Sequence, residues 1–411
     1  MIKMEYTFWN VGQGLFSSGR IIDNNKEFIW VYDCGSTNQH HIIPSVKKMK
    51  DRYQNKVIDL LAISHFDKDH ISGLSELLKG RTVRYLFMPY YPLEERLFIF
   101  FKNKVDKSLF EFYLNPFQYL QKHYGDSLTD SCTIILIPPS TSDENSDSGN
   151  FSTINFDEFD EFDKSDINTK NGLKYLDSDS IGENIKFTIV SLKKAIKFTY
   201  QGISFIPYNM PLQVVGIPAN LEKLKQDIKN ILSKYNNDIS NALIDLKNLY
   251  KKRFTNKQNI ISLFLYVLPD QGVFNKITLT NEVDITSNKY FCFLNRLRHY
   301  FGYCQCLNNY NGFALLYTGD GNLNKKEYFK LLEDYIGVDN IEKMFCLQVP
   351  HHGSRSNWYQ GLANDIEAKI AVFSANPLGR YHHPHFEVLS DFLPCRTFTV
   401  DLYQNLTIKY Q

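Results

Sequence analysis

The stretch "LLAISHFDKDHISGL" (residues 60–74) constrains the fold more than any other part of the sequence. An apolar, β-rich run ends at Ser64, which is typical of a strand that is buried on both faces of its sheet. The loop that follows carries two imidazoles and two carboxylates: His65, Asp67, Asp69 and His70. Crowding these groups would cost desolvation and charge repulsion, but together they suit a divalent cation. We therefore predict a layered α/β protein with a metal site at the end of this strand.

Other strand-like runs end in the same kinds of residue. "FIWVY" is followed by Asp33, "GFALLYTG" by Asp320, and "FCLQVP" by His351 and His352. Sites in layered sheets are built at the ends of strands along one edge, so we expect these side chains to converge. Asp320 and one or both of the paired histidines are predicted to be further metal ligands. Asp33 is predicted to support the site from outside the metal's direct contacts, although a simple "DCG" turn would also explain it.

A further histidine-rich stretch, "PLGRYHHPHFEVL", follows the strand-like run "IAVFSAN". Within it, His383 is a candidate catalytic residue that donates to a leaving oxygen or contacts phosphate. A histidine that only satisfies its own turn is an equal alternative. Arg380, and Ser354 and Arg355 after "HHG", are candidate phosphate-binding residues, because a guanidinium can contact two phosphate oxygens at once.

The order of predicted elements divides the chain into three parts. Residues 1–95 fit a β-β-α-β-α-β pattern, in which "EYTFWNV" and "EFIWVYDCG" are strands joined by a turn-rich hairpin region, "GQGLFSSGRIIDNN". Residues 257–411 again alternate strands and helices. Residues 96–256 are predicted to be a large irregular and helical insertion that could act as a lid. It contains an acidic loop at 138–166 and an apolar stripe at 221–250, which fits one long helix or two helices broken near "YNND".

Charge and cysteine usage restrict the partners and the compartment. The net charge of +1 gives no overall nucleic-acid signature, so any such contact needs a local patch. The basic tract "KNLYKKRFTNK" (247–257) is one candidate, but a solvated helix end is the favoured interpretation. The seven cysteines are irregularly spaced, as is typical of reduced thiols in the cytoplasm. No signal-peptide pattern or long apolar run is found, so we predict a cytoplasmic protein without membrane contact.

Taken in chain order, these motifs resemble the metallo-β-lactamase-fold hydrolases, and in particular the metallo-β-lactamase domain of ComEC-type competence proteins. That branch has a "DVGQGD"-like opening, a strand ending in Asp-x-Gly, a "SHxDxDHxxG" loop, a "GD" after a strand, "PHHGS" and a late "N…HP". The corresponding segments here are "NVGQGLF" at 10–16, "DCG" at 33–35, "SHFDKDHISG" at 64–73, "GD" at 319–320, "PHHGS" at 350–354, Asn376 and His383-Pro384. The resemblance implies the four-layered αββα metallo-β-lactamase fold, and it does not cover residues 95–256.

Two departures from the family pattern bear on the chemistry. The usual loop, H-x-H-x-D-H, has Asp67 here in place of its second histidine, and the family's separate middle histidine has no clear counterpart. A site richer in oxygen favours Mn²⁺ over Zn²⁺, so we predict one or two divalent ions, with Mn²⁺ first and Zn²⁺ second. Leu15 stands where the opening motif of the family has an aspartate, so no role is assigned to that acid.

The resemblance implies a hydrolase in which metal-activated water attacks an electrophile. One ion is assigned to His65 and Asp67, and the other to Asp69, His70 and one or both histidines of "HHGS". Asp320 is predicted to bridge or complete the pair. Asp69 is also a candidate catalytic residue, since the resembled family implies that it orients the attacking water.

The favoured function is a phosphodiesterase or nuclease that cleaves DNA or RNA, as the resembled domain is held to degrade DNA. Because soluble members of this branch look like components of bacterial defence loci, the resemblance also implies that this chain is a bacterial antiphage-defence effector. One alternative is a hydrolase of a small ester, amide or cyclic nucleotide, whose turnover would not depend on the basic tract 247–257. The other is a binding module without chemistry of its own, or an effector regulated by a protein partner.

Overall fold

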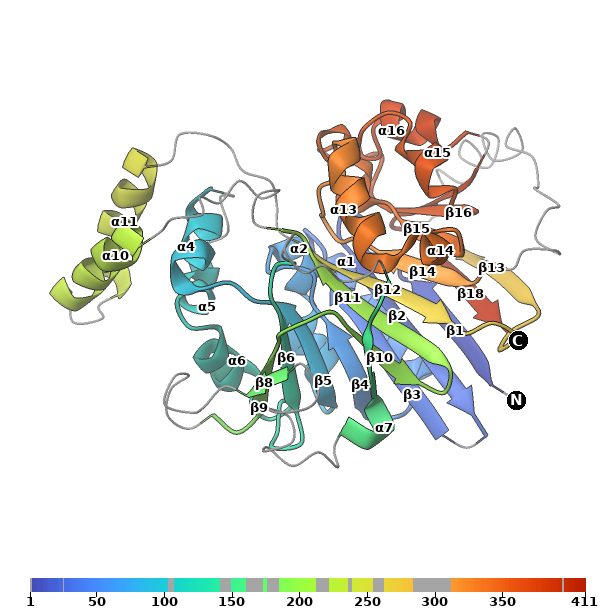
Figure 1. The fold of residues 1–411 in the computed structure, drawn as a ribbon, viewed down its shortest axis with the longest axis horizontal. Helices are drawn as coiled ribbons and strands as arrows, with labels where there is room; N and C mark the ends of the chain where they lie inside the picture. Colours follow the sequence, from blue (N-terminus) through green and yellow to red (C-terminus); the bar gives the residue numbers. More distant parts are fainter. Residues whose placement is uncertain are drawn as a thin grey trace.

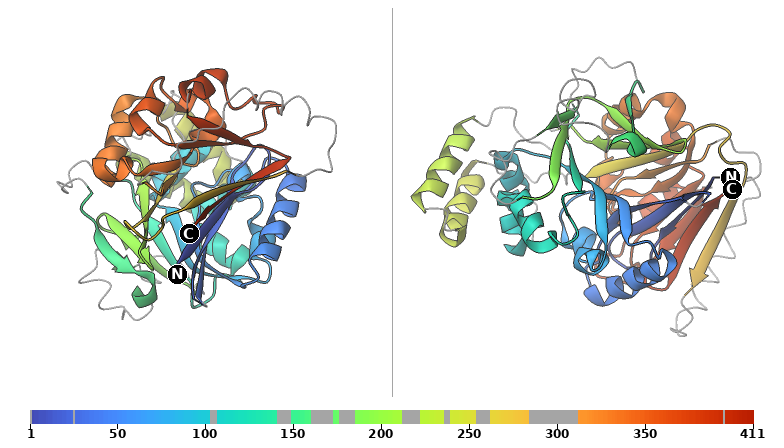
Figure 2. Two further views of the ribbon diagram at one scale, coloured as in Figure 1. Left: turned by 90° about the vertical axis from the view of Figure 1, so that its right-hand side faces the viewer. Right: turned by 90° about the horizontal axis from the view of Figure 1, so that it is seen from below.

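Two β-sheets pack face to face at the centre of the molecule, and helices cover the outer face of each sheet (Figure 1). This computed structural model describes residues 2–24, 26–102, 107–140, 149–159, 173–175, 185–211, 222–235, 239–253, 262–283, 312–393 and 395–411. The predicted four-layered αββα fold is thereby confirmed, and Figure 2 shows the layers from two further sides. In the part of the chain described, no helix is long and apolar enough to cross a membrane.

The first sheet contains ten strands in the order β13-β18-β1-β2-β3-β4-β5-β6-β9-β8. Within it, β3, β4, β5, β6 and β9 run parallel to one another. Because parallel strands end at the same edge of a sheet, the loops that follow β3 and β4 lie side by side. The strands are β1 (Lys3–Phe8), β2 (Phe16–Asp23), β3 (Lys26–Cys34), β4 (Val57–Ala62), β5 (Thr82–Pro89), β6 (Thr133–Ile137), β8 (Leu173–Tyr175), β9 (Thr188–Leu192), β13 (Ile277–Val283) and β18 (Gln404–Tyr410).

The second sheet contains eight strands in the order β17-β16-β15-β14-β12-β11-β10-β7. Here β14, β15, β16 and β17 are parallel, so the loops after β14, β15 and β16 also share one edge. The strands are β7 (Ser152–Asn155), β10 (Ile196–Tyr200), β11 (Ile203–Asn209), β12 (Leu263–Pro269), β14 (Ala314–Tyr317), β15 (Met344–Gln348), β16 (Ile370–Ser374) and β17 (Arg396–Val400).

The alternation of side chains along the central strands explains the layering. In β3, Trp30 and Tyr32 point into the core between the sheets, whereas Ile29 and Val31 face the helices outside. The core between the sheets is rich in aromatic rings, and Tyr32 stacks on Tyr317 of the other sheet with ring centroids 4.5 Å apart. Both faces of β3 are therefore buried, as the near-continuous apolar run predicted.

Helices of the N-terminal part and helices of the C-terminal part cover different sheets (Figure 2). Over the first sheet and beside it lie α1 (Gln39–Arg52), α3 (Leu74–Leu78), α4 (Leu93–Lys102), α5 (Phe110–Leu114), α6 (Pro116–Tyr124), α10 (Glu222–Lys234) and α11 (Ile239–Arg253). Over the second sheet lie α13 (Lys326–Ile336), α14 (Val338–Ile341), α15 (Leu362–Ile366) and α16 (Phe386–Asp391). The remaining helices, of three or four residues each, are α2 (Lys68–Ile71), α7 (Phe156–Phe159), η1 (Lys107–Leu109), η4 (Pro350–Gly353) and η5 (Arg355–Asn357).

The predicted hairpin region at 12–25 is mostly a strand, so that prediction was wrong. Its small residues belong to β2, which pairs with both β1 and β3. Gly19 must be small because the large ring of Trp30 lies across it: a Cβ added to Gly19 would lie 2.1 Å from that ring. Ser17 and Ser18 beside it are fully buried. Local sequence suggested a turn, and packing against a neighbouring strand made a strand instead.

The segment predicted as an insertion, 96–256, contributes to both sheets as well as to the helices outside them. Strands β6 and β9 extend the first sheet, and β10 and β11 extend the second. The apolar stripe forms two helices, α10 and α11, which stand away from the sheets beside α4 (Figure 1). Parts of the acidic loop (141–148 and 160–166) and the end of the basic tract (254–257) lie outside the described residues. The boundaries of the insertion and its action as a lid stay predictions.

Candidate metal centre

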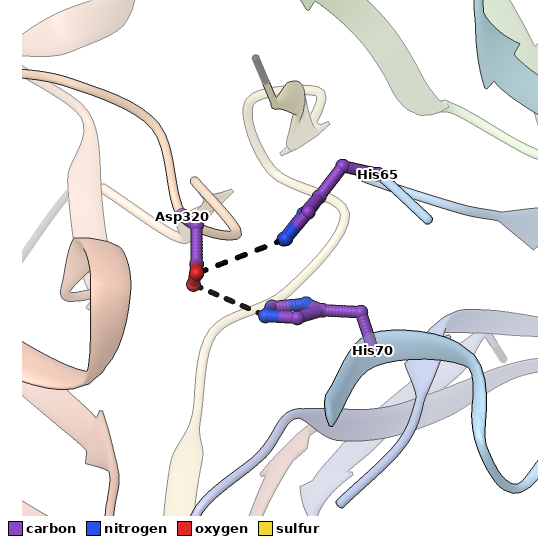
Figure 3. Close-up of side chains that lie close together, drawn as sticks. All are labelled: His65, His70 and Asp320. Atoms are coloured by element: carbon purple, nitrogen blue, oxygen red, sulfur yellow. Dashed lines mark ion pairs between the residues drawn. The ribbon is translucent and has the colours of Figure 1, made fainter. Parts of the chain in front are cut away.

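His65 and His70 project from the loop after β4 toward Asp320, which follows β14 of the other sheet (Figure 3). Nε2 of His70 lies 3.1 Å from Oδ1 of Asp320, and Nε2 of His65 lies 3.7 Å from its Oδ2. The three ligand atoms all lie within 4.8 Å of one another, and all three side chains are buried. This geometry could hold one metal ion with ligands from both sheets.

The turn that presents Asp320 is fixed by side chains from neighbouring strands. Gly319 has a φ of +53°, and a Cβ there would lie 2.2 Å from Oγ of Ser262, so a larger residue would not fit. Oε1 of Gln348 accepts hydrogen bonds from two N–H groups of this turn, each at 2.8 Å. Oγ of Ser262 accepts one from the N–H of Asp320 at 3.0 Å. The carboxylate is therefore held by a rigid backbone.

Both histidines of the "PHHG" turn also face this carboxylate. Nε2 of His351 lies 3.5 Å from Oδ2 of Asp320, and Nε2 of His352 lies 3.8 Å from Oδ1. His352 approaches Asp69 as well, at 3.3 Å, and with His70 these two form a second group that could hold an ion. The two histidines have φ values of +48° and +59°, which are uncommon for residues other than glycine and cluster at functional sites.

Asp33 fixes the orientation of His70. Its Oδ2 accepts a hydrogen bond from Nδ1 of His70 at 2.7 Å, and its two oxygens also accept from the backbone N–H and hydroxyl of Ser64. Because an ionised carboxylate only accepts, Nδ1 carries a proton, and Nε2 points to Asp320. Nδ1 of His65 similarly lies 3.0 Å from the Ser64 hydroxyl. Metal-binding histidines are held in this way through their other nitrogen.

The paired histidines follow the same rule. Nδ1 of His352 donates to the backbone carbonyl of Ser374 at 2.6 Å, and Nδ1 of His351 lies 2.8 Å from the amide oxygen of Asn357. A carbonyl oxygen can only accept, so the proton of each ring sits on Nδ1. Each Nε2 is therefore free to coordinate. All four imidazoles thus present Nε2 to the same small volume.

Several buried polar atoms at the centre have no hydrogen bond of good geometry with the described chain. They are Nε2 of His65, Nε2 of His70 and Oδ1 of Asp320. Buried polar groups without partners are rare in proteins, and each one calls for an explanation. A divalent cation explains all three at once, because nitrogen lone pairs and a carboxylate oxygen are its natural ligands.

The pKa values of the loop residues reflect the crowding of negative charge. Burial, with the charges of Asp69 and Asp320, raises the pKa of Asp67 to about 7. Burial opposes ionisation of Asp69 too, but the neighbouring imidazoles of His352 and His70 lower its pKa to about 2. Burial lowers the pKa of His65 to about 3. Asp67 is thus the loop carboxylate whose ionisation its acidic neighbours oppose, and a bound cation would favour its charged form.

The "GQG" motif holds the metal loop against the late histidine-rich loop. A Cβ on Gly14 would lie 2.9 Å from the backbone oxygen of Asp69, so the backbone of the motif lies directly against that of the metal loop. The N–H of Leu15 donates to the same oxygen at 3.1 Å. Leu15 itself is buried in the core between the sheets. The motif therefore has a structural task here that needs no acid at position 15.

Gln13 of the same motif orients His383. Its Oε1 faces the N–H of Asn376 at 3.5 Å, so its Nε2 faces Nδ1 of His383, at 3.3 Å. Nδ1 then accepts, and the proton of the neutral ring sits on Nε2. Burial and the nearby His352 and His351 lower the pKa of His383 to about 3. His383 is thus a neutral ring whose Nε2–H can donate, 6.1 Å from the ring of His352.

The three predicted phosphate contacts are not drawn into this cluster. The hydroxyl of buried Ser354 bonds to that of Ser356 at 2.8 Å. Arg355 is exposed and pairs with Glu387 at 3.1 Å. Arg380 is exposed in the loop before α16. Of the predicted ligands, Asp67 lies 3.8 Å from His65 but outside both groups that could hold an ion.

Five residues of the site were not singled out from the sequence, and they differ in how they could have been found. Gln13 and Ser64 lie inside the quoted "VGQG" and "SHFDKDH" motifs, so their position was a signal. Ser262, Gln348 and Asn357 carry no motif, and only the fold shows that they support Asp320 and His351.

Partial matches link the chain to known nucleases, while no protein-family model matches it. It is 34% identical over 86 residues to ribonuclease Z of Listeria welshimeri, which covers 19% of this chain and 26% of that protein. It is 33% identical over 87 residues to ribonuclease BN of Proteus mirabilis, covering 20% and 27%. It is 30% identical over 100 residues to ComE operon protein 3 of Bacillus subtilis, covering 24% and 12%. The chain thus spans about a quarter or less of these curated relatives.

Among solved structures, the chain aligns with the metallo-β-lactamase fold protein YhfI from Bacillus subtilis. The alignment covers 98% of both chains, with 8% sequence identity and a TM-score of 0.36.

Proposed function

We propose that this chain, which has the metallo-β-lactamase fold, is a metal-dependent hydrolase that cleaves phosphodiester bonds in DNA or RNA. The observation that carries the proposal is the set of buried, unpartnered atoms on His65, His70 and Asp320, which face one another from the two sheets. The partial likeness to ribonuclease Z and ribonuclease BN supports a phosphodiester as the bond that is cut.

Two groups of residues would hold the metal. His65, His70 and Asp320 form one, and Asp69, His70 and His352 form the other. A divalent cation held there supplies a Lewis acid that favours deprotonated water and stabilises negative charge on oxygen. Mn²⁺ first and Zn²⁺ second stays the prediction from the sequence, where it is based on Asp67, a residue that lies outside both groups. His351 completes the ring of imidazoles around Asp320.

The remaining residues would position the reaction. Asp69, whose pKa is low, stays ionised and can accept a proton or orient a water molecule. His383 offers a neutral Nε2–H that can donate a hydrogen bond to a phosphate or leaving oxygen. Asp33 holds His70 in the coordinating tautomer from behind. Arg380 lies outside the cluster, where a longer substrate would reach it.

The test is cleavage of single- and double-stranded DNA and RNA by purified protein in Mn²⁺ or Zn²⁺, beside the Asp69→Ala, His70→Ala double variant. We expect the wild type alone to cut, and chelation to stop it. A bis-p-nitrophenyl phosphate assay in parallel reports phosphodiester chemistry without a nucleic acid.

Turnover of a cyclic nucleotide, small ester or amide with no cutting of any nucleic acid would support the small-substrate alternative instead. No turnover of any substrate by protein that contains metal would contradict a free-standing hydrolase. A requirement for a protein partner and a role in antiphage defence stay predictions from the resemblance.

A further inference from the structure

Exposed apolar side chains are concentrated in the segment of the chain around His383. The described chain has six exposed large apolar side chains, and four of them lie between residues 378 and 393. The two aromatic ones are both among these four: Tyr381 is 53% exposed and Phe386 is 78% exposed. Single exposed apolar residues are ordinary, but a concentration of them in one short stretch indicates a contact surface.

A series of rings connects this stretch to the metal centre. His383 lies nearly parallel to His352, with an interplanar angle of 23° and ring centroids 6.1 Å apart. Tyr381 lies nearly parallel to His383 on the way outward, with an angle of 26° and a centroid distance of 6.0 Å. The series therefore runs from a candidate metal ligand, through a buried ring, to a ring that is half in solvent.

The charges on this rim favour an anionic partner. Arg380 is exposed one residue before Tyr381, and Arg355 is exposed nearby, with its backbone N–H bonded to His385 at 3.2 Å. Glu387 is the acid that faces them, and it pairs with Arg355. His382 is exposed as well. Aromatic faces interleaved with cationic groups match a strand of unpaired bases joined by phosphates.

We propose that the rim formed by Arg380, Tyr381 and Phe386 binds single-stranded nucleic acid, with bases stacked on the two aromatic rings and a phosphate on Arg380. The inference rests on the proposed function for its substrate class, and it adds that the strand must be unpaired. A duplex hides its base faces by stacking them on one another, so exposed rings can only engage bases that are free.

Binding can be measured without any cleavage. Fluorescence anisotropy of full-length protein in EDTA, with labelled oligo(U) and oligo(dT), would report binding without cleavage. Tyr381→Leu and Phe386→Leu keep apolar bulk and remove the ring, and each should weaken binding about 5- to 100-fold. Tyr381→Phe keeps the ring and should bind like the wild type. Ile244→Ala changes an equally exposed apolar residue on distant α11 and serves as the control.

Two further probes separate bases from phosphates. A strand of abasic nucleotides should bind weakly to the wild type and should be indifferent to the two leucine substitutions. Arg380→Gln should weaken binding of the abasic strand and of the oligonucleotides with bases by the same factor. It should also reduce the salt dependence of binding by about one phosphate contact. A duplex of the same length should bind less tightly than the single strand.

The outcomes distinguish this inference from the proposed function. If both leucine variants bind oligo(U) and oligo(dT) like the wild type, or if abasic and duplex probes bind as well as the single strands, the rim does not stack bases, whatever the protein cleaves. If base-dependent binding is lost in the leucine variants while no nucleic acid is cut under any condition, the rim stands and the proposed cleavage fails. In Mn²⁺, the leucine variants should raise KM for single-stranded substrates more than they lower kcat.

Discussion

Two histidine-rich loops meet at the candidate centre, and they use the same residue type in opposite ways. In the loop after β4, His65 and His70 are both buried, and each presents Nε2 to Asp320. In the loop before α16, the rings pass from buried His383 to exposed Tyr381. The first loop is closed around a volume that fits an ion, whereas the second opens toward solvent.

The difference lies in what holds the second nitrogen of each ring. Nδ1 of His70 donates to a carboxylate, which leaves Nε2 as a lone pair that can coordinate. Nδ1 of His383 faces the amide of Gln13, which leaves Nε2–H as a donor. A histidine count does not reveal this distinction, because the partner of the ring decides between ligand and donor.

Removing the carboxylate shared by the four imidazoles should have the largest effect. Asp320→Ala deletes the group that faces Nε2 of His65, His70, His351 and His352. We expect bound metal to be lost and nucleic-acid cleavage to fall by about 1000-fold or more. Metal content by elemental analysis and cleavage rates would be measured together. Full metal content with an unchanged rate would show that Asp320 is not needed to hold the ion.

Asp59, on the strand β4 that leads into the metal loop, offers a contrast to the carboxylates in that loop. Asp59 of β4 is buried and accepts from the N–H of Ile29, but its nearest cation, Arg84, is 4.0 Å away. Burial raises its pKa to about 6. Because this folded-state pKa lies above the ordinary value, the charged form destabilises the fold, and stability falls as pH rises from about 4 through about 6.

Asp59→Asn should therefore stabilise the protein at pH 8, by up to about 3 kcal/mol, with the gain vanishing toward pH 4. Urea unfolding of both proteins at several pH values would measure it. The substitution leaves the metal loop untouched, so metal content should not change. Equal stability at pH 8 would mean that burying a carboxylate on this strand costs little, and the case that the loop's own carboxylates need a cation would weaken.

The positions of the candidate ligands could be predicted from the sequence, because they come after apolar strands. His65 and Asp320 each follow a strand end by three residues, His70 lies one turn of chain further on, and the two sheets pack so that these ends face each other. The partners of the ligands could not be predicted in the same way. The contact between Gln13 and His383 joins residues 370 positions apart, and no local pattern records it.

The strand β2 shows the same limit in the fold. Its glycine and serines are typical of turns, so the sequence alone predicts a turn there. They form a strand by pairing with β1 and β3, and Gly19 leaves the space that the ring of Trp30 occupies. Small residues thus had two physical explanations, backbone freedom and room for a neighbour, and only the packing of the neighbouring strand decided between them.

Asp33, which holds His70 of the first loop, should contribute more to metal affinity than to the stability of the fold. In Asp33→Asn, an NH2 group replaces one of the two oxygens. The backbone N–H of Ser64 and Nδ1 of His70 bond to different oxygens of Asp33, so one of these two hydrogen bonds is lost. We expect metal affinity to fall about 10- to 100-fold, measured by competition with a chelating dye. Asp391→Asn is the matched control, since this buried aspartate accepts from Trp358 and from backbone N–H groups away from the cluster. It should lower thermal stability and leave metal affinity as in the wild type.

If both variants lose metal equally, general loosening of the fold would explain the loss, and Asp33 would have no special link to His70.

The smallest effect is expected at Gln13, which contacts His383 of the second loop. Gln13→Glu places a carboxylate against Nδ1 of His383, which draws the ring proton to Nδ1 and leaves Nε2 without one. The donor proposed for the substrate oxygen disappears, while the metal ligands keep their partners. We expect kcat to fall about 10-fold, as for the loss of one hydrogen bond in the transition state. Metal content should be unchanged.

Gln13→Met sharpens this test, because it removes the amide but adds no acceptor, so the ring keeps its Nε2–H in part of the molecules. Its kcat should lie between those of the wild type and Gln13→Glu. The same order should hold in Mn²⁺ and in Zn²⁺, since the change acts on His383 and not on the ion. If Gln13→Glu cleaves as fast as the wild type, His383 only fills its turn, and the second loop serves binding alone.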